Sequence, residues 1–194
     1  MATTGLAANQ KGARQRGRSI VFLDETGFML QPVVRRTWAP RGCTPVLASW
    51  DRHDRLSVSS ALTLAPRRRR LALRFSIQAR NVRWPDVYRF VRAVMVRCRR
   101  PVVLVLDRLN AHRSAVKRLV ARFGGRVEVE WLPAYAPELN PVEPVWSHTK
   151  HSDLANYIPK HVGALASAVR RSLRSKTKEP DLLRSFFKIA GLKL

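Results

Sequence analysis

The stretch "PVVLVLD", Pro101 to Asp107, is the clearest indication of the fold. The residues between its ends are all apolar, so both faces of the segment are suited to burial, as in a central strand of a covered sheet. Around this stretch the chain alternates between helical and strand patterns. Such alternation predicts parallel strands joined by right-handed crossovers, with helices packed on the sheet.

Amphipathic segments lie on both sides of this strand. Upstream, apolar residues recur at helical spacing from about Trp84, and downstream a second helical pattern ends at Gly124-Gly125. The two apolar stripes consist of Val87, Phe90, Val91, Val94 and Cys98, and of Val116, Leu119, Val120 and Phe123. "RVEVEW", 126–131, alternates strictly and predicts a half-exposed strand. A further helix is expected over about 160–175, and a C-terminal tail, 176–194, with room for one short helix.

The first half of the chain is predicted to supply strands. Residues 1–18 are polar, basic and aperiodic, which is typical of a flexible arm. "SIVFLDETGF", 19–28, begins with an apolar strand that runs into Asp24. Short strand-like pieces surround Trp38 and Val46.

Two further segments, "RLSVSSALTL" and "LALRFSI", predict a hairpin whose tip, "APRRRR", is basic. Early hairpins indicate antiparallel pairing beside the parallel strands. Residues 19–175 are therefore predicted to form one α/β domain, a mixed sheet of about five strands flanked by helices.

Charge is the strongest global signal, because 37 Lys and Arg residues face only 13 Asp and Glu residues, for a net charge of +24. Such an excess indicates a polyanionic partner, most often nucleic acid. A codon bias could explain why arginine outnumbers lysine, but it does not explain the scarcity of carboxylates. No apolar run approaches the ~20 residues that span a bilayer, and no secretory signal is recognisable. Cys43 and Cys98 lack metal-ligand spacing and are expected to be reduced thiols of a cytosolic protein.

The few acidic residues include two that end apolar strands, Asp24 and Asp107. Polar groups at such strand ends converge on a crevice, and an aspartate against an apolar strand is costly unless it is paired or holds a metal. A third acid, Glu143, follows in "LPAYAPELNPVEPVWSHTK", 132–150. Three carboxylates suit Mg²⁺ or Mn²⁺. For each acid alone, a helix cap or an ion pair is the alternative, and Glu143 could complete a capping box with Asn140.

"FLDETGF", "LDRLNAHRS" and "LPAYAPELNPVEPVWSHTK" resemble, in this order, the three motifs of the DDE transposases. They are most similar to the bacterial insertion-sequence branch of the mariner-like superfamily. The resemblance implies a ribonuclease H-like fold. It also implies that Asp24, Asp107 and Glu143 are the catalytic residues and the ligands of two Mg²⁺ or Mn²⁺ ions, with Glu138 structural. Arg108 departs from the asparagine of many relatives.

The resemblance further implies the catalytic domain of a transposase. Such an enzyme cleaves DNA at transposon ends and joins the freed 3′-OH to target DNA, with a preference for TA sites. Its partners are expected to be DNA, a second copy in a homodimer and a separate helix-turn-helix polypeptide, since only 23 residues precede Asp24. Its location is expected to be the bacterial cytoplasm, at the nucleoid. Two alternatives stay open: a non-catalytic DNA-binding remnant, and another ribonuclease H-like nuclease.

Several residues near the motifs are weaker candidates. DNA contacts are predicted for basic side chains, against the alternative of solvated charges, at Arg67, Arg68, Arg69, Arg70, His112, Arg113 and Lys150. Glu25 adjoins Asp24 but should face the opposite side of its strand, so the two are not expected to share one metal. Trp146 is interpreted as a core residue.

Overall fold

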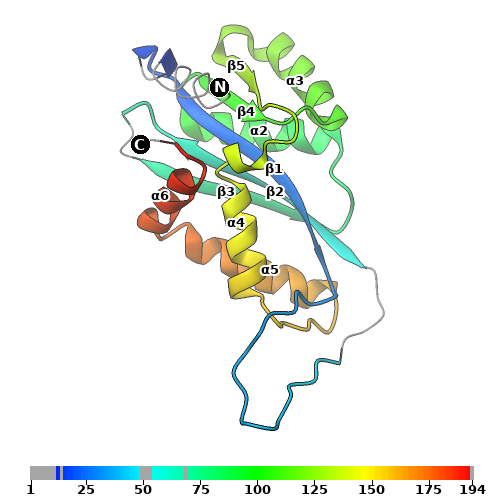
Figure 1. The fold of residues 1–194 in the computed structure, drawn as a ribbon. Coiled ribbons are helices and arrows are strands. Elements are labelled where there is room, and N and C mark those ends of the chain that lie inside the picture. Colours follow the sequence, from blue (N-terminus) through cyan, green and yellow to red (C-terminus); the bar gives the residue numbers. More distant parts are fainter. Residues whose placement is uncertain (1–11, 14, 49–53, 68–69, 193–194) are drawn as a thin grey trace.

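The computed structural model describes residues 12–192 except 14, 49–53 and 68–69, and its centre is a mixed five-stranded sheet (Figure 1). The strand order is β3-β2-β1-β4-β5. The strands are β1 (Ser19–Met29), β2 (Arg55–Leu64), β3 (Leu71–Gln78), β4 (Val102–Leu106) and β5 (Val127–Trp131). β1, β4 and β5 are parallel, whereas β2 and β3 pair antiparallel beside β1. The predicted mixed sheet is therefore confirmed.

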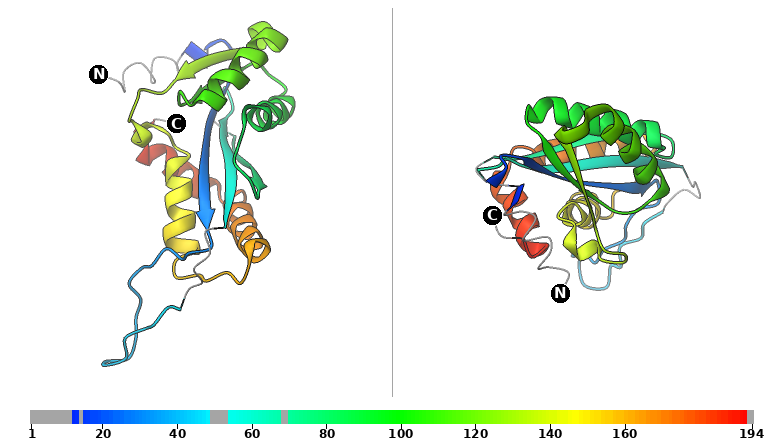
Figure 2. Two further views of the ribbon diagram at one scale, coloured as in Figure 1. Left: turned by 90° about the vertical axis from the view of Figure 1, so that its right-hand side faces the viewer. Right: turned by 90° about the horizontal axis from the view of Figure 1, so that it is seen from above.

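Helices cover both faces of the sheet. Their bounds are α2 (Trp84–Cys98), α3 (Asn110–Phe123), α4 (Glu143–His148), α5 (Val162–Lys176) and α6 (Pro180–Ile189). Short 3-10 turns, η1 (Gly124–Arg126) and η2 (Pro137–Leu139), precede β5 and α4, and a π-helical turn, η3 (Thr149–Asp153), extends α4. Seen from above, α2 and α3 lie on one side of the sheet and α4 and α6 on the other (Figure 2).

The two layers follow from the alternation of side chains along the central strand. In β4, Val103 and Val105 belong to the apolar core that also contains residues of α4, α5 and α6. The alternating residues Val102, Leu104 and Leu106 belong to the core under α2 and α3. All residues of β4 are buried, because successive side chains of a strand point to opposite faces and here both faces are covered.

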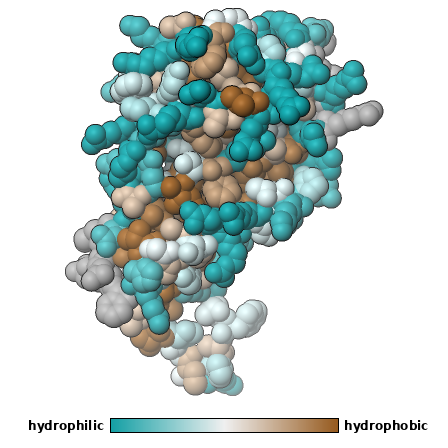
Figure 3. Space-filling model, turned by 180° about the vertical axis from the view of Figure 1, so that it is seen from behind, coloured by the Kyte–Doolittle hydropathy of each residue, from teal (hydrophilic) through white to brown (hydrophobic). Residues whose placement is uncertain are grey.

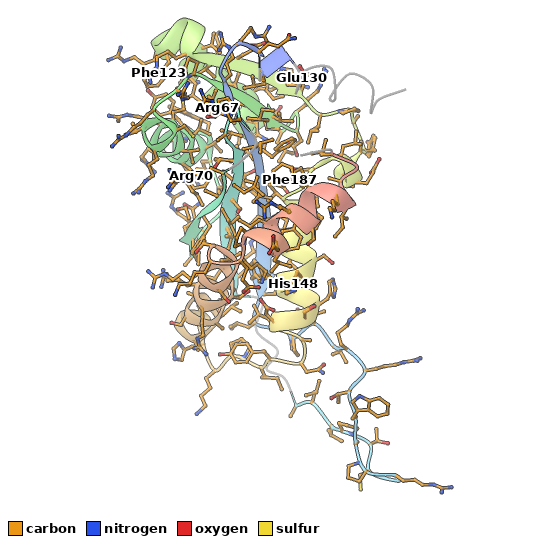
Figure 4. All side chains as sticks on the ribbon, turned by 90° about the vertical axis from the view of Figure 1, so that its left-hand side faces the viewer. Arg67, Arg70, Phe123, Glu130, His148 and Phe187 are labelled. Atoms are coloured by element: carbon orange, nitrogen blue, oxygen red, sulfur yellow. The ribbon has the colours of Figure 1, made fainter. Side chains whose placement is uncertain are left out.

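The segment expected to be a tail adds a packed helix to the first of these cores. α6 carries Leu183, Phe186 and Phe187 at spacings of three and four residues, and all three side chains are buried. The Phe187 ring meets the Phe22 ring of β1 edge to face, with centroids 5.6 Å apart. Figure 4 shows Phe187 directed toward the sheet.

Two expectations for the first half of the chain were wrong. β1 does not end near Leu23 but continues to Met29, because β2 pairs with it along its whole length. The stretch 34–48 contains no strand, and Trp38 is fully exposed. Among the described residues no strand pairs with its backbone, and it projects from the body of the molecule (Figure 1). Most of the expected arm, residues 1–11 and 14, lies outside the described residues.

Within the part of the chain that the structure describes, no helix is both long and apolar enough to cross a membrane.

Candidate active site

The register of the parallel strands brings Asp24, inside β1, close to Asp107, which directly follows β4. β4 pairs with β1 only from Ser19 to Phe22, with Phe22 opposite Val105. Continuing this register by two residues sets Asp24 opposite Asp107, on chains about 4.8 Å apart. β1 therefore continues past the end of β4 and leaves an open notch beside Asp24.

A cavity of about 190 Å³ lies at this notch, and all three predicted acids line it. The rest of its wall comes from the loop between β5 and α4. The lining residues are Asp24, Asp107, Leu132, Pro133, Tyr135, Ala136, Pro137, Asn140 and Glu143. The structure thus places Asp24, Asp107 and Glu143 around one space, although they are far apart in sequence.

Asp24 lies in the least polar part of the site. It is 9% exposed, and the indole Nε1–H of Trp146 donates to its Oδ2 at 2.9 Å. Burial and, next, the nearby Glu143 carboxylate together raise the pKa of Asp24 to about 7, against the lowering effect of the indole hydrogen bond. The pocket therefore disfavours a second negative charge beside Glu143 unless a cation accompanies it.

Asp107 lies in a more polar environment. Its side chain is 44% exposed, and its Oδ1 accepts hydrogen bonds from the Leu109 N–H at 3.1 Å and from the His112 ring at 2.5 Å. Burial acts to raise the pKa of Asp107, but the hydrogen bonds from His112 and Leu109 outweigh it and hold the pKa below its ordinary value. Asp107 is therefore ionised in the folded protein.

His112 bridges Asp107 to a fourth acid, Glu25. Its side chain is 1% exposed, with Nδ1 at 2.5 Å from Asp107 and Nε2 at 2.5 Å from Glu25 Oε2. Burial alone would lower the pKa of His112, but the two carboxylates raise it to about 10. At neutral pH the imidazolium donates from both nitrogens, one to each acid. The other oxygen of Glu25, Oε1, is buried without a hydrogen-bond partner in the described structure.

Glu143 is the first residue of α4, and its carboxylate is not used in a cap. The helix has Val142 as its N-cap residue. The Asn140 N–H, which a capping box would give to Glu143, donates instead to the Pro137 carbonyl at 2.9 Å. The Asn140 side chain ties the loop to β1, because its Nδ2 donates to the Leu23 carbonyl at 3.3 Å. Glu138 is exposed on η2, outside the 190 Å³ cavity.

The predicted DNA contacts separate into residues near this site and residues far from it. Lys150 is half-buried beside the acids, and its Nζ donates to Thr26 Oγ1 at 2.7 Å. Burial lowers the pKa of Lys150, although Glu143 and Asp24 act in the opposite direction. Arg113 is exposed on α3, whereas the interior position of His112 does not favour a contact with DNA. Arg67 and Arg70 are exposed at the β2–β3 tip (Figure 4), and Arg68 and Arg69 lie outside the described residues.

The donor chemistry of the site fits a divalent cation. Three carboxylates share one cavity, and the pKa of Asp24 is raised first by burial and then by the Glu143 carboxylate, both of which a bound cation would offset. Among the described residues, however, no three His, Cys, Asp or Glu side chains stand close enough together to hold an ion as they are. Asp107 is turned toward His112 in this conformation, so ligation by all three acids requires side-chain movement.

Two contacts of the site were missed from the sequence. The Glu25–His112–Asp107 chain joins β1 to α3, and the Trp146–Asp24 bond joins α4 to β1. The alternation of β1 gave a usable signal, because it turns Glu25 to the face opposite Asp24. α3, which follows Asp107 directly, packs on that opposite face.

Comparisons with known proteins give the family and the fold of the chain. The family described as DDE superfamily endonuclease matches residues 19–163. None of the curated proteins matches the chain. The structure resembles a Mos1 mariner paired-end complex with Mn, at 17% identity and a TM-score of 0.61, covering 95% of this chain and 58% of that one.

Two other Mos1 structures are similar to the same degree. They are a pre-cleavage transpososome (14% identity, TM-score 0.59, 100% of this chain and 61% of that chain) and a strand transfer complex (15%, 0.57, 98% and 60%). The chain therefore spans about three fifths of the length of the proteins that it matches. At these identities the likeness is one of fold, and the predicted ribonuclease H-like architecture is confirmed.

Proposed function

Because the chain belongs to the DDE superfamily of endonucleases, we propose that it is the catalytic domain of a transposase, from the bacterial insertion-sequence branch of the mariner-like superfamily. It cleaves DNA at transposon ends and joins the freed 3′-OH to target DNA. The observation that carries the proposal is the cavity lined together by Asp24, Asp107 and Glu143, inside the matched segment.

Asp24, Asp107 and Glu143 are the proposed ligands of two Mg²⁺ or Mn²⁺ ions. Such a pair, when bound, activates a water and stabilises the leaving oxygen of a phosphodiester. Structures of Mos1 complexes with Mn and with Mg accord with this choice of metal. The Trp146 indole holds Asp24 in place, whereas the His112 imidazolium holds Asp107 in a position from which its side chain would move to bind the ions.

The partner of this site is proposed to be DNA. Lys150 supplies a positive charge beside the acids and is suited to orient a phosphate, because a lysine ammonium binds phosphate as a point charge. The net charge of +24 supports sequence-independent attraction to the backbone through counterion release. A homodimer, a helix-turn-helix polypeptide for recognition of transposon ends and a place at the bacterial nucleoid complete the proposal.

The test is cleavage of supercoiled plasmid with Mn²⁺ by the wild type, Glu143→Gln and Glu138→Gln. We expect the wild type and Glu138→Gln to nick, and Glu143→Gln to lose at least a hundredfold in rate, because only Glu143 lines the cavity. Strand transfer is measured in parallel, as joining of a labelled 3′-OH end to plasmid. Equal nicking by all three proteins would exclude Glu143 from the reaction.

A second candidate function is a DNA-binding remnant without catalysis. The observation in its favour is that no metal-ready group of three side chains stands assembled among the described residues. Titration of Mn²⁺ by calorimetry separates the two candidates independently of cleavage. A transposase domain binds Mn²⁺ and loses binding in Glu143→Gln, whereas a remnant binds DNA with no metal response.

A further inference from the structure

A second hollow, distinct from the acidic cavity, lies between the edge strand β3 and helix α2. Its volume is about 570 Å³. One wall is made by alternate residues of β3, Arg74, Ser76 and Gln78, which share a face because the side-chain period of a strand is two. The opposite wall is one face of α2, whose residues recur at helical spacing. They are Asp86, Arg89, Phe90, Ala93, Val94 and Arg97. We call this hollow the β3–α2 groove.

The groove is basic, since four arginines and one carboxylate line it. The carboxylate, Asp86, is already engaged: Arg80 contacts both of its oxygens at 2.6 and 2.7 Å, and Arg89 contacts it at 2.5 Å. The Arg80 hydrogen bonds, aided by the Arg83 N–H, hold the pKa of Asp86 well below its usual range. Asp86 therefore fixes two guanidinium groups on one wall and leaves an excess of three positive charges in the groove.

Arg74 carries the unsatisfied group of the groove. Its Nε is buried and has no hydrogen-bond partner in the described structure. It lies close enough to Cys98 for its charge to oppose the effect of burial, which raises the pKa of that thiol. A buried donor without an acceptor costs about 1–3 kcal/mol, and more when it is charged. Because the Nε is buried, an anionic oxygen in the groove would reach it only once the Arg74 side chain turns outward.

We propose that the β3–α2 groove binds the sugar–phosphate backbone of duplex DNA without reading its sequence, an inference that rests on the proposed function as a DNA-processing enzyme. Guanidinium groups match phosphate oxygens in pairs, which suits Arg74, Arg89 and Arg97 to this ligand. The α2 wall from Asp86 to Arg97 extends about 16 Å, which equals about five base-pair steps along the axis of duplex DNA.

The surroundings of the groove extend the basic surface. β3 begins directly after the β2–β3 tip, where Arg67 and Arg70 are exposed (Figure 4). Seen from behind, hydrophilic side chains cover most of the upper half of the molecule, the half that includes α2 and α3 (Figure 3). Arg67 and Arg70 therefore continue the positive charge of the groove at the tip.

The groove and the acidic cavity are related by the sheet register. Arg74 pairs with Ala61, which pairs with Leu23, the residue before Asp24. The groove thus lies at the level of the acids, two strands or about 10 Å away. It opens on the α2 side, whereas Asp24 faces Trp146 of α4. The bound backbone is therefore DNA outside the point of cleavage, either the flank of the cut duplex or the target.

The test is binding of a labelled duplex, measured by fluorescence anisotropy in EDTA over a series of salt concentrations. The variants are Arg97→Gln, Arg74→Gln and their combination. The matched control is Arg92→Gln, which removes the same charge from an exposed position of α2 outside the groove. Each groove variant should lower the slope of log K against log salt by about one, and the combination by about two, with equal loss on unrelated sequences.

The binding results distinguish failure of the groove proposal from failure of the proposed function. If Arg92→Gln weakens binding as much as Arg97→Gln, only general charge matters and the groove proposal fails. If poly-glutamate competes as well as DNA of equal charge, the groove takes acidic protein instead. Absence of DNA binding by the wild type would refute the proposed function itself. Thermal denaturation checks that Arg74→Gln folds, and Arg97→Gln, altered at an exposed position, tests the groove even where Arg74→Gln does not.

Discussion

Asp24 and Asp107 lie opposite each other just beyond the paired segment of two parallel strands, yet their pKa values are shifted in opposite directions. Asp24 is buried against an indole and near a second acid, and its pKa rises to about 7. Asp107 is half-exposed beside an imidazolium, and its pKa falls. The difference arises because burial and the Glu143 carboxylate of α4 raise the pKa of Asp24, whereas hydrogen bonds from His112 of α3 and from the Leu109 N–H lower the pKa of Asp107. Position in the sheet brings acids together, but the covering helices set their charge.

The largest loss of stability is expected from His112→Ala, which removes the cation beside Asp107. The variant leaves Glu25 and Asp107 facing each other without their shared cation, and the Glu25 side chain is only 12% exposed. Removal of one partner from a buried ionic contact costs about 3–5 kcal/mol. Urea denaturation at pH 7 measures the loss in the free energy of unfolding, with Arg113→Ala, an exposed neighbour on α3, as the control expected within about 0.5 kcal/mol. A loss equal to that of the control would show that the bridge contributes nothing.

A smaller effect is expected from Asp24→Asn, and it depends on pH. The folded pKa of Asp24, about 7, lies above its unfolded value of 3.8, so its contribution to stability is complete below pH 3.8 and is lost as the pH rises through 7. Metal-free wild type should lose at most about 4 kcal/mol between pH 4 and 8 relative to Asp24→Asn. Parallel stability curves in EDTA for the two proteins would contradict the raised pKa. Mn²⁺ should restore the wild type alone.

The smallest loss of stability is expected from Trp146→Phe, which tests the hydrogen bond to Asp24 without a change of charge. Phenylalanine keeps the apolar bulk near the Phe28 ring, now 6.3 Å from the indole, but removes the hydrogen bond to Asp24. A net loss of about 1–2 kcal/mol is expected above pH 7 and less below it, because the bond favours the ionised acid. Denaturation at pH 5 and pH 8 measures both. A loss independent of pH would assign Trp146 to packing alone.

Much of the fold could be predicted because its signals are local. The apolar run 102–106, the helical stripes from Trp84 and before Gly124, and the hairpin pattern all correspond to elements of the structure. The end of β1 could not be placed in this way, because its last residues are held by pairing with β2 rather than by their own pattern. The strands expected near Trp38 and Val46 are absent for the converse reason. Their local pattern suits a strand, but no described strand lies beside them to pair with.

The candidate site was predictable only in part, for a related reason. The order and spacing of three motifs identified Asp24, Asp107 and Glu143, and the structure brings all three to one cavity. It also supplied partners that no spacing indicated, such as Glu25 for His112 across 87 positions of sequence. The unsatisfied Arg74 Nε likewise depends on which side of β3 faces α2.

The sequence by itself determined the alternation of strands and helices, the basic net charge and the choice of three candidate acids, because periodicity, composition and motif order are properties of the chain itself. Only the tertiary structure decided which acid is buried beside an indole, which one is bridged to an imidazolium, and where arginines line a groove. These features depend on burial and on contacts between distant segments, and both arise only when the sheet and its two helix layers close around them.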